Sequence, residues 1–262
     1  MEWENLTSPE FGKAVKRSRG VCVLPLGVME KHGEHLPLGT DLFQARHIAV
    51  EAARREAAVV FPWYYFTQIH EAKHYPGAVA LPGELMYRLL LETCEEIARN
   101  GLRKIILYNG HGGNNYFLPY FCQMALERPR NYMLFYPQGG GDPELEGRIR
   151  KVSKDPYDGH AGEQETSNML VIAPELVRLK ADIPSRGVPK KGIGNLPNTY
   201  NGIWWYASQP YHYRGKASLG RADKGRLYLE NDIRYLAHVI RAVKKDSAVA
   251  RYTREFFAKT RH

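Results

Sequence analysis

The residues with the clearest chemical potential lie close together near the N-terminus. Two carboxylates, Glu30 and Asp41, flank two imidazoles, His32 and His35, and Glu34 adds a further carboxylate. Oxygen ligands mixed with imidazole nitrogens suit divalent zinc, manganese or iron. A solvated polar loop can have the same composition. This stretch alone therefore leaves a metal site and an ordinary surface loop both open.

Two later stretches carry the same kinds of side chain. His111 lies among three glycines in residues 109–114, and glycine lets a backbone turn tightly and approach a ligand closely. A third stretch places His160 ahead of two carboxylates, Glu163 and Glu165. Three loops that each carry a histidine or carboxylate indicate one convergent site. The function they favour is that of a metal-dependent hydrolase.

These loops need strands and helices to bring them together. Apolar runs predict strands at 21–26, 58–61, 104–108 and 132–136. Helical spacing predicts helices around 45–52, at 83–100, from about 116, in a run that ends before Pro174, and at 222–245. Because strands alternate with helices, the sequence predicts a three-layer α/β/α fold with a mostly parallel central sheet. Sites in such folds lie in the loops that follow the strands.

Two other segments lack such a pattern. Residues 139–158 begin with three glycines and are otherwise polar, which predicts a mobile connection. Residues 184–220 are rich in glycine, proline and aromatics, and long irregular segments of this kind usually have a function. The Trp-Trp-Tyr run at 204–206, together with His212, would suit a flat, ring-shaped ligand, because such side chains combine apolar area with polar tips. Packing in the core is the alternative.

The composition limits the class of protein. The chain has 262 residues, of which 44% are hydrophobic, and no linker divides it, so residues 1–262 are predicted to form a single domain. Three scattered cysteines without Cys-x-x-Cys spacing predict buried thiols in a reducing cytoplasm. No window approaches the ~18 uninterrupted apolar residues that a membrane span requires.

The net charge of +9 is concentrated in residues 178–262, which hold 18 Lys and Arg against 6 Asp and Glu. A basic surface can bind nucleic acid. Here the charges are dispersed, and no arginine-rich block or recognition motif accompanies them. A solvated or subunit-facing surface, or one that attracts an anionic group of a substrate, is favoured over a nucleic-acid interface.

Taken in order, three motifs resemble those of the creatininase (creatinine amidohydrolase) family. They are Glu-x-His-Gly-x-His-Leu-Pro followed by Asp, Asn-Gly-His-Gly-Gly-Asn, and His-Ala-Gly-x-x-Glu-Thr-Ser. The resemblance covers about residues 20–175 and is weaker towards the C-terminus. It implies a hydrolase of cyclic or formyl amides with two divalent metal ions, and a homo-oligomer, specifically a hexamer. Some members act on pterin- or riboflavin-type precursors, a peptide cofactor precursor or keto-inositols.

The resemblance also implies how the metal ions are held. Glu30, Asp41 and His111 would hold one ion, and His32 would serve the second. Two cations close together repel each other, so a shared carboxylate is needed to neutralise them, and Asp41 is the candidate for that bridge. His35 is expected to orient the site rather than to bind metal.

One departure from the family concerns the second ion. In creatininase itself a Glu two residues beyond the counterpart of His111 binds that ion, and this chain has Gly113 there. Glu165 matches the family's Glu-Thr-Ser position and is the first choice for the missing ligand, with Glu163 as the reserve. His160 matches the histidine that passes a proton to the leaving nitrogen; a metal ligand or an outer hydrogen-bond donor is its alternative role.

The expected substrate is small and ring-shaped. A cyclic amide or a formylamino-pyrimidine would be cleaved at a C–N bond, whereas a cyclic ketone or keto-cyclitol would be cleaved at a C–C bond. Two interpretations from other classes remain open. One is a family member without catalytic activity, and the other is a nucleic-acid-binding protein that uses the basic residues 178–262.

Overall fold

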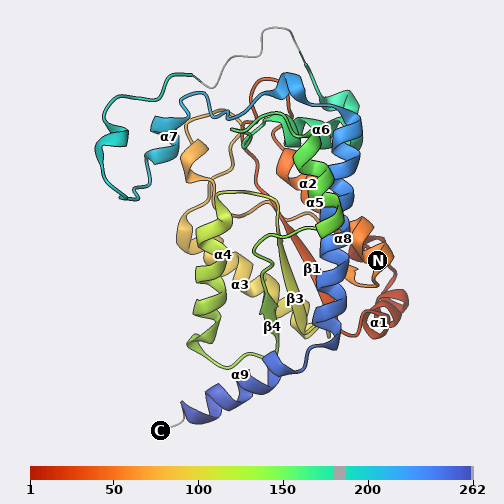
Figure 1. Ribbon diagram of the computed structural model, residues 1–262. Helices are drawn as coiled ribbons and strands as arrows, with labels where there is room; N and C mark the ends of the chain where they lie inside the picture. The colour runs from red at the N-terminus through yellow and green to blue at the C-terminus, as the bar shows by residue number, and fades with distance from the viewer. Residues whose placement is uncertain (180–186, 261–262) are drawn as a thin grey trace.

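The computed structural model describes residues 1–179 and 187–260. A sheet of four parallel strands, in the order β2-β1-β3-β4, forms its centre (Figure 1). The strands are β1 (Val21–Leu26), β2 (Val59–Val60), β3 (Lys104–Asn109) and β4 (Met133–Phe135). β1 pairs with β3 along its whole length, and Leu26 faces Asn109 where both strands end. The loops that follow β1 and β3 therefore start side by side.

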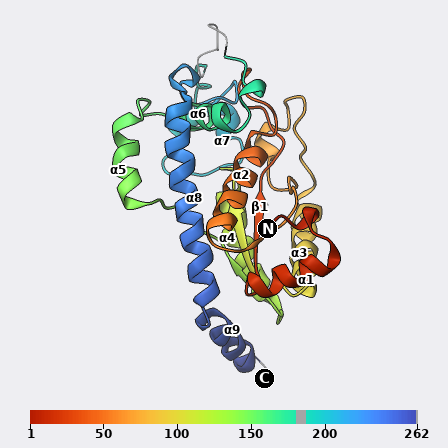
Figure 2. The same ribbon diagram turned by 90° about the vertical axis from the view of Figure 1, so that its right-hand side faces the viewer.

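Helices cover both faces of this sheet. They are α1 (Ser8–Arg17), α2 (Thr40–Arg55), α3 (Gly83–Arg99), α4 (Asn114–Met124), α5 (Pro143–Val152), α6 (Glu163–Ile172), α7 (Trp204–Ser208), α8 (Ala222–Lys245) and α9 (Ala248–Lys259). α1, α3 and α4 pack on one face, and α2 and α8 pack on the other. Figure 2 shows α1 and α3 to the right of β1 and α8 to its left. The predicted three-layer α/β/α fold with a parallel sheet is confirmed.

The central strand β1 shows why the sequence folds in this way. Cys22, Leu24 and Leu26 contribute to the core beneath α3 and α4, whereas Val21 and Val23 contribute to the core beneath α2 and α8. Successive side chains of a strand point to opposite faces, so a strand covered on both sides needs an unbroken apolar run. All six residues of β1 are buried.

The predicted element boundaries need small corrections. The strands expected at 58–61 and 132–136 are shorter, and the helix expected from about 116 begins at Asn114. The mobile connection predicted for 139–158 is wrong, because α5 lies within these residues. The Asp142 carboxylate caps this helix by accepting hydrogen bonds from the backbone of Glu144 and Leu145, and Leu145 is buried.

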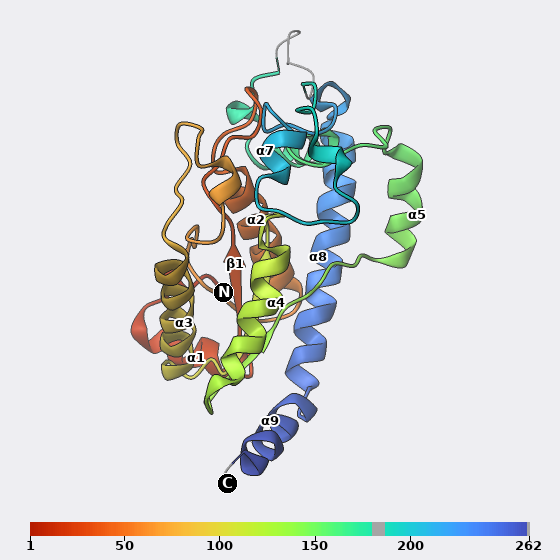
Figure 3. The ribbon, with the colours of Figure 1, turned by 90° about the vertical axis from the view of Figure 1, so that its left-hand side faces the viewer.

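Two terminal helices and one long segment complete the chain. Helices α1 and α9 were not predicted; α9 runs away from the sheet, opposite α6 and α7 (Figure 1). Of the segment 184–220, residues 184–186 lie outside the described part, and the rest is irregular apart from α7 and short 3-10 turns. Residues 187–220, which include α7, lie above α2 and α4 in Figure 3. Within the described ranges, no helix has the length and apolar character needed to cross a bilayer.

Candidate metal centre

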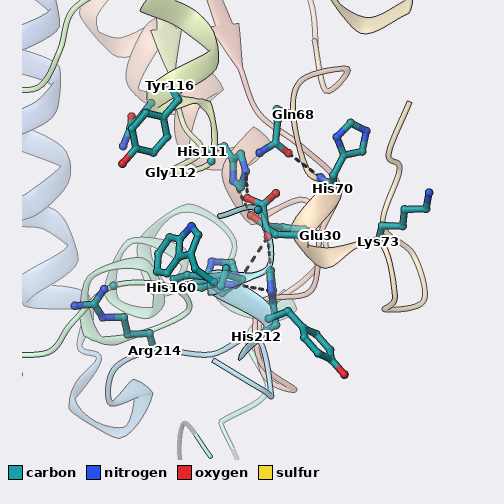
Figure 4. A pocket seen from close by; sticks show the side chains of 18 of the residues that line it. Glu30, Gln68, His70, Lys73, His111, Gly112, Tyr116, His160, His212 and Arg214 are labelled. Carbon is teal, nitrogen blue, oxygen red and sulfur yellow. Dashed lines mark hydrogen bonds and ion pairs between the residues drawn. The ribbon is translucent and has the colours of Figure 1, made fainter. Parts of the chain in front are cut away.

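The predicted site residues meet where β1 and β3 end. Glu30 and His32 lie in the loop after β1, and His111 follows β3 by two residues. Asp41 is the second residue of α2. All four are buried, and Figure 4 shows Glu30 close to His111. The carboxyl ends of neighbouring parallel strands have thus brought together residues that are up to 81 positions apart in the sequence.

One group of ligands consists of Glu30, Asp41 and His111. His111 Nδ1 lies 2.8 Å from Glu30 Oε1 and 3.0 Å from Asp41 Oδ2. Within the described part of the chain, neither carboxylate oxygen has a hydrogen-bond partner in good geometry. Because a buried oxygen without a partner costs free energy, these converging atoms fit a bound cation.

A second group consists of His32, Asp41 and Glu165. His32 Nε2 lies 3.0 Å from Asp41 Oδ1 and 3.7 Å from Glu165 Oε2. Asp41 therefore turns one oxygen towards each histidine. In these two groups, and in a third made of Glu30, His32 and His160, the atoms that could bind metal lie within 4.8 Å of one another. The geometry matches two cation sites that share one carboxylate.

The charge of this cluster also fits metal ions. Among the described residues, no Lys or Arg forms an ion pair with Glu30, Asp41 or Glu165. Burial lowers the pKa of His32, but the negative charges of Asp41 and then Glu165 outweigh this effect and raise the pKa to about 10. Burial likewise opposes the charge on His111, yet Glu30 and Asp41 raise its pKa well above the usual value. Divalent ions would supply this positive charge and release the protons from the histidines.

A cavity of about 1020 Å³ opens beside the cluster. Glu30, Asp41, His111, His160 and Glu165 contribute to its wall. Tyrosine and tryptophan side chains line other parts of it, namely Tyr116, Tyr200, Trp204, Trp205 and Tyr206. This volume accommodates a small molecule next to the candidate metal ligands.

Comparison with known proteins identifies the family. A sequence model described as creatinine amidohydrolase matches residues 4–240. The chain belongs to the creatininase family. Its relatives include creatinine amidohydrolase from Pseudomonas putida, which is 26% identical over 90% of this chain and 94% of that protein. Another is 3-dehydro-scyllo-inosose hydrolase from Thermotoga maritima, 24% identical over 92% of this chain and 83% of that protein.

Other relatives of this creatininase-family hydrolase have a different named substrate. Mycofactocin precursor peptide peptidase from Mycolicibacterium smegmatis is 33% identical over 59% of each chain. Among solved structures, a manganese form of creatininase matches with a TM-score of 0.75 at 24% identity, covering 94% of this chain and 99% of that one. A zinc–zinc form of a creatininase variant also gives a TM-score of 0.75. The last two similarities show a shared fold.

The structure separates the two candidates for the missing creatininase ligand. Glu163 turns away from the cluster, because its carboxylate accepts hydrogen bonds from the backbone of Lys154 and Asp155 and forms an ion pair with Lys224. Glu165 instead lies beside His32, at the distance given above. The first choice of the sequence analysis is therefore the one placed in the cluster, and the reserve has a structural role.

His160 borders both the cluster and the cavity. Its Nε2 donates a hydrogen bond of 2.7 Å to the Lys31 carbonyl, and a carbonyl can only accept, so this nitrogen carries the proton of the neutral ring. Burial lowers the pKa of His160 to about 3, against the effect of Glu30. A neutral ring with Nδ1 unprotonated can take up a proton there.

His35 lies just behind the cluster. Its Nε2 is 2.9 Å from Thr166 Oγ1, and the ring packs edge-on against Tyr213. Burial lowers its pKa to about 4. This arrangement agrees with the expected orienting role and keeps His35 out of both ligand groups.

Two neighbours of the cluster, His212 and Glu71, were not predicted. His212, which was expected to contact a ligand, lines the cavity, and its Nε2 also lies 2.5 Å from Glu30 Oε2. Glu71 Oε1 lies 3.7 Å from His111 Nε2 and comes from the aromatic, polar loop between β2 and α3. A carboxylate in such a loop was the available signal for Glu71, but nothing in the sequence connects that loop to His111.

Gly113, the position of the expected departure from creatininase, is crowded by two side chains. A Cβ at this position would overlap Glu71 Oε1 and His111 Nε2, whereas a Cβ at the neighbouring Gly112 would meet nothing within 4 Å. We expect Gly113→Ala to displace His111 and weaken metal binding at least about tenfold, as the loss of support for a ligand usually does. The metal affinity of Gly112→Ala should equal that of the wild type. Chelator competition measures both, and equal affinities would contradict the prediction.

Proposed function

We propose that this creatininase-family hydrolase uses two divalent ions of zinc, manganese or iron to hydrolyse the C–N bond of a cyclic amide or formamide. One observation carries the proposal: Asp41 belongs to both ligand groups, with its two oxygens 3.0 Å from nitrogens of different histidines. Bound in this cluster, the ions would lower the pKa of a water molecule and polarise the substrate carbonyl.

The protein residues then have separate tasks. Glu30 and His111 would complete one ion site with Asp41, and His32 and Glu165 would complete the other. The three carboxylates bring negative charge into the cluster, and among the described residues no Lys or Arg forms an ion pair with them. They would therefore hold two cations close together despite the repulsion between those cations.

We assign His160 the role of a proton shuttle, which its place beside the cluster and its neutral ring support. Its neutral ring would take the proton from the attacking water at Nδ1 and pass it to the leaving nitrogen. An amine leaves poorly as an anion, so this transfer is needed before the C–N bond breaks. The contact with His32 supports this role, because the centroids of the His160 and His32 rings lie 4.3 Å apart, which places His160 beside a candidate metal ligand.

The cavity supports a ring-shaped substrate, because aromatic side chains line it beside the cluster. A keto-cyclitol is the second candidate, favoured by the similarity to the Thermotoga maritima inosose hydrolase over most of both chains.

The basic residues after position 178 are partly paired within the chain, as in Arg234 with Glu230 and Arg241 with Glu56, which gives nucleic-acid binding less support. The hexameric assembly stays a prediction.

Metal removal tests the proposed function. The purified protein should contain about two transition-metal ions per chain by mass spectrometry, and a chelator should abolish its hydrolase activity. Zinc, manganese and iron, added back separately, would identify the effective ion. Cyclic amides, formamides and cyclic ketones should be compared as substrates in the same assay. A protein that binds no metal, or an activity that a chelator leaves intact, would refute the metal mechanism.

A further inference from the structure

A chain of two hydrogen bonds leads from the aromatic wall of the cavity to Glu30. Trp205, in α7, donates from its indole Nε1 to His212 Nδ1 over 2.7 Å. On the other side of the same imidazole, Nε2 lies 2.5 Å from Glu30 Oε2. His212 is only 2% exposed. Figure 4 shows His212 directed at Glu30, on the side away from His111.

The first hydrogen bond determines the tautomer of His212. An indole nitrogen can only donate, so His212 Nδ1 must accept and carries no proton. The proton of the neutral ring is then on Nε2, which donates it to Glu30 Oε2. Both nitrogens of His212 are therefore occupied, and this histidine is not available as a metal ligand although it touches Glu30.

The second hydrogen bond determines how Glu30 is turned. With Oε2 held by His212, the other oxygen, Oε1, is the one left facing His111, and it has no hydrogen-bond partner in good geometry in the described part of the chain. We infer that Trp205 and His212 form a positioning pair, which holds Glu30 with Oε1 towards the metal site. This inference rests on the proposed function, because it assigns the free oxygen to a metal ion.

The backbone around the pair is arranged to keep it in place. The backbone of His212 has a φ of +51°, a left-handed conformation that residues other than glycine seldom adopt. Its backbone N–H donates to the Gln209 carbonyl, and the N–H of Gln209 donates to the Trp205 carbonyl, so the turn after α7 sets the distance between the two rings. Such conformations persist where the surrounding structure holds them, and they cluster at functional sites.

The chain offers a matched control for testing this pair. Trp204 precedes Trp205, lines the same cavity and contacts the Trp205 ring edge-on. Among the described residues, no acceptor bonds to its indole N–H. Trp205→Phe therefore removes the donor to His212, whereas Trp204→Phe makes the same chemical change and leaves both hydrogen bonds of the pair in place.

We expect Trp205→Phe to weaken zinc binding by about tenfold or more, the usual effect of losing an outer partner of a metal ligand. Trp204→Phe should stay within about twofold of the wild type. Competition with a chromophoric zinc chelator gives both affinities. In the full-length protein, ¹⁵N chemical shifts should show His212 with its proton on Nε2, and only Trp205→Phe should change this tautomer.

A double-mutant cycle separates positioning from general damage to the fold. In His212→Gln the side-chain amide can still donate to Glu30 but needs no indole, so adding Trp205→Phe should cause no further loss of zinc affinity. Additive losses, or equal zinc affinities for the two tryptophan variants, would overturn the inference and leave the proposed function standing. A wild-type protein that binds no zinc, manganese or iron would overturn both.

Discussion

Asp41→Asn is expected to reduce hydrolysis to background and to remove at least one metal ion from each chain, while the fold persists. The carboxylate oxygens lie 3.0 Å from His32 Nε2 and 3.0 Å from His111 Nδ1. The amide has no negative charge, and its nitrogen presents hydrogens where an oxygen would bind. Two cations would then face each other with too little charge between them. Metal analysis, activity and circular dichroism of the variant check the three parts of this prediction.

Glu163→Gln is the control for that variant. Glu163 is also a buried carboxylate, but it pairs with Lys224 outside the cluster. Its replacement should leave the metal content unchanged and lower the thermal stability, because a buried lysine loses its charged partner. If Asp41→Asn keeps both ions and most of the activity, the shared role of Asp41 is wrong.

His160→Ala should lower turnover by roughly two to four orders of magnitude, the usual loss for a general acid or base. The metal content should stay near that of the wild type, since Glu30, Asp41 and His111 remain at one site and Glu165 with His32 at the other. A proton shuttle matters most when the leaving group is a poor one. Turnover measured on amides with graded leaving groups, together with an activated ester, checks this dependence.

The two roles considered for His160 give different results in that series. For a proton shuttle, the variant should recover most on the ester, whose leaving group departs without a proton. Loss of a metal ligand would slow good and poor leaving groups alike and would lower the metal content. That second pattern would place His160 among the ligands, where its Nε2 lies 3.8 Å from Glu30 Oε2.

The sheet was predictable because its strands are encoded locally. The unbroken apolar runs of β1 and β3 have one structural explanation, a strand buried on both faces. Helix α5 was missed because the glycines at 139–141 suggested a flexible connection. Yet Asp142 followed by Pro143 is a usual start for a helix, with a capping carboxylate and a proline in the first turn. The signal for this helix was present and was given too little weight.

Some residues of the candidate site could likewise be predicted from local sequence, and others could not. Glu30, His32 and Asp41 belong to one short motif, so their proximity could be anticipated. The Glu-Thr-Ser match already favoured Glu165 over Glu163, but the contact that holds Glu163 elsewhere comes from Lys224, 61 residues beyond it. His212 reaches Glu30 across 182 residues from a segment without periodic pattern. Tertiary contacts of this kind leave no trace in local sequence spacing.

The spread of the cluster along the chain has a consequence for biosynthesis. Glu30 and Asp41 leave the ribosome early, but Glu165 follows more than a hundred residues later, and Trp205 and His212 later still. Domains generally fold as units during synthesis rather than residue by residue. For most of translation the growing polypeptide therefore holds an incomplete set of ligands. If the proposed function holds, the metal ions would therefore bind late in maturation, after the residues from Glu165 to His212 have docked.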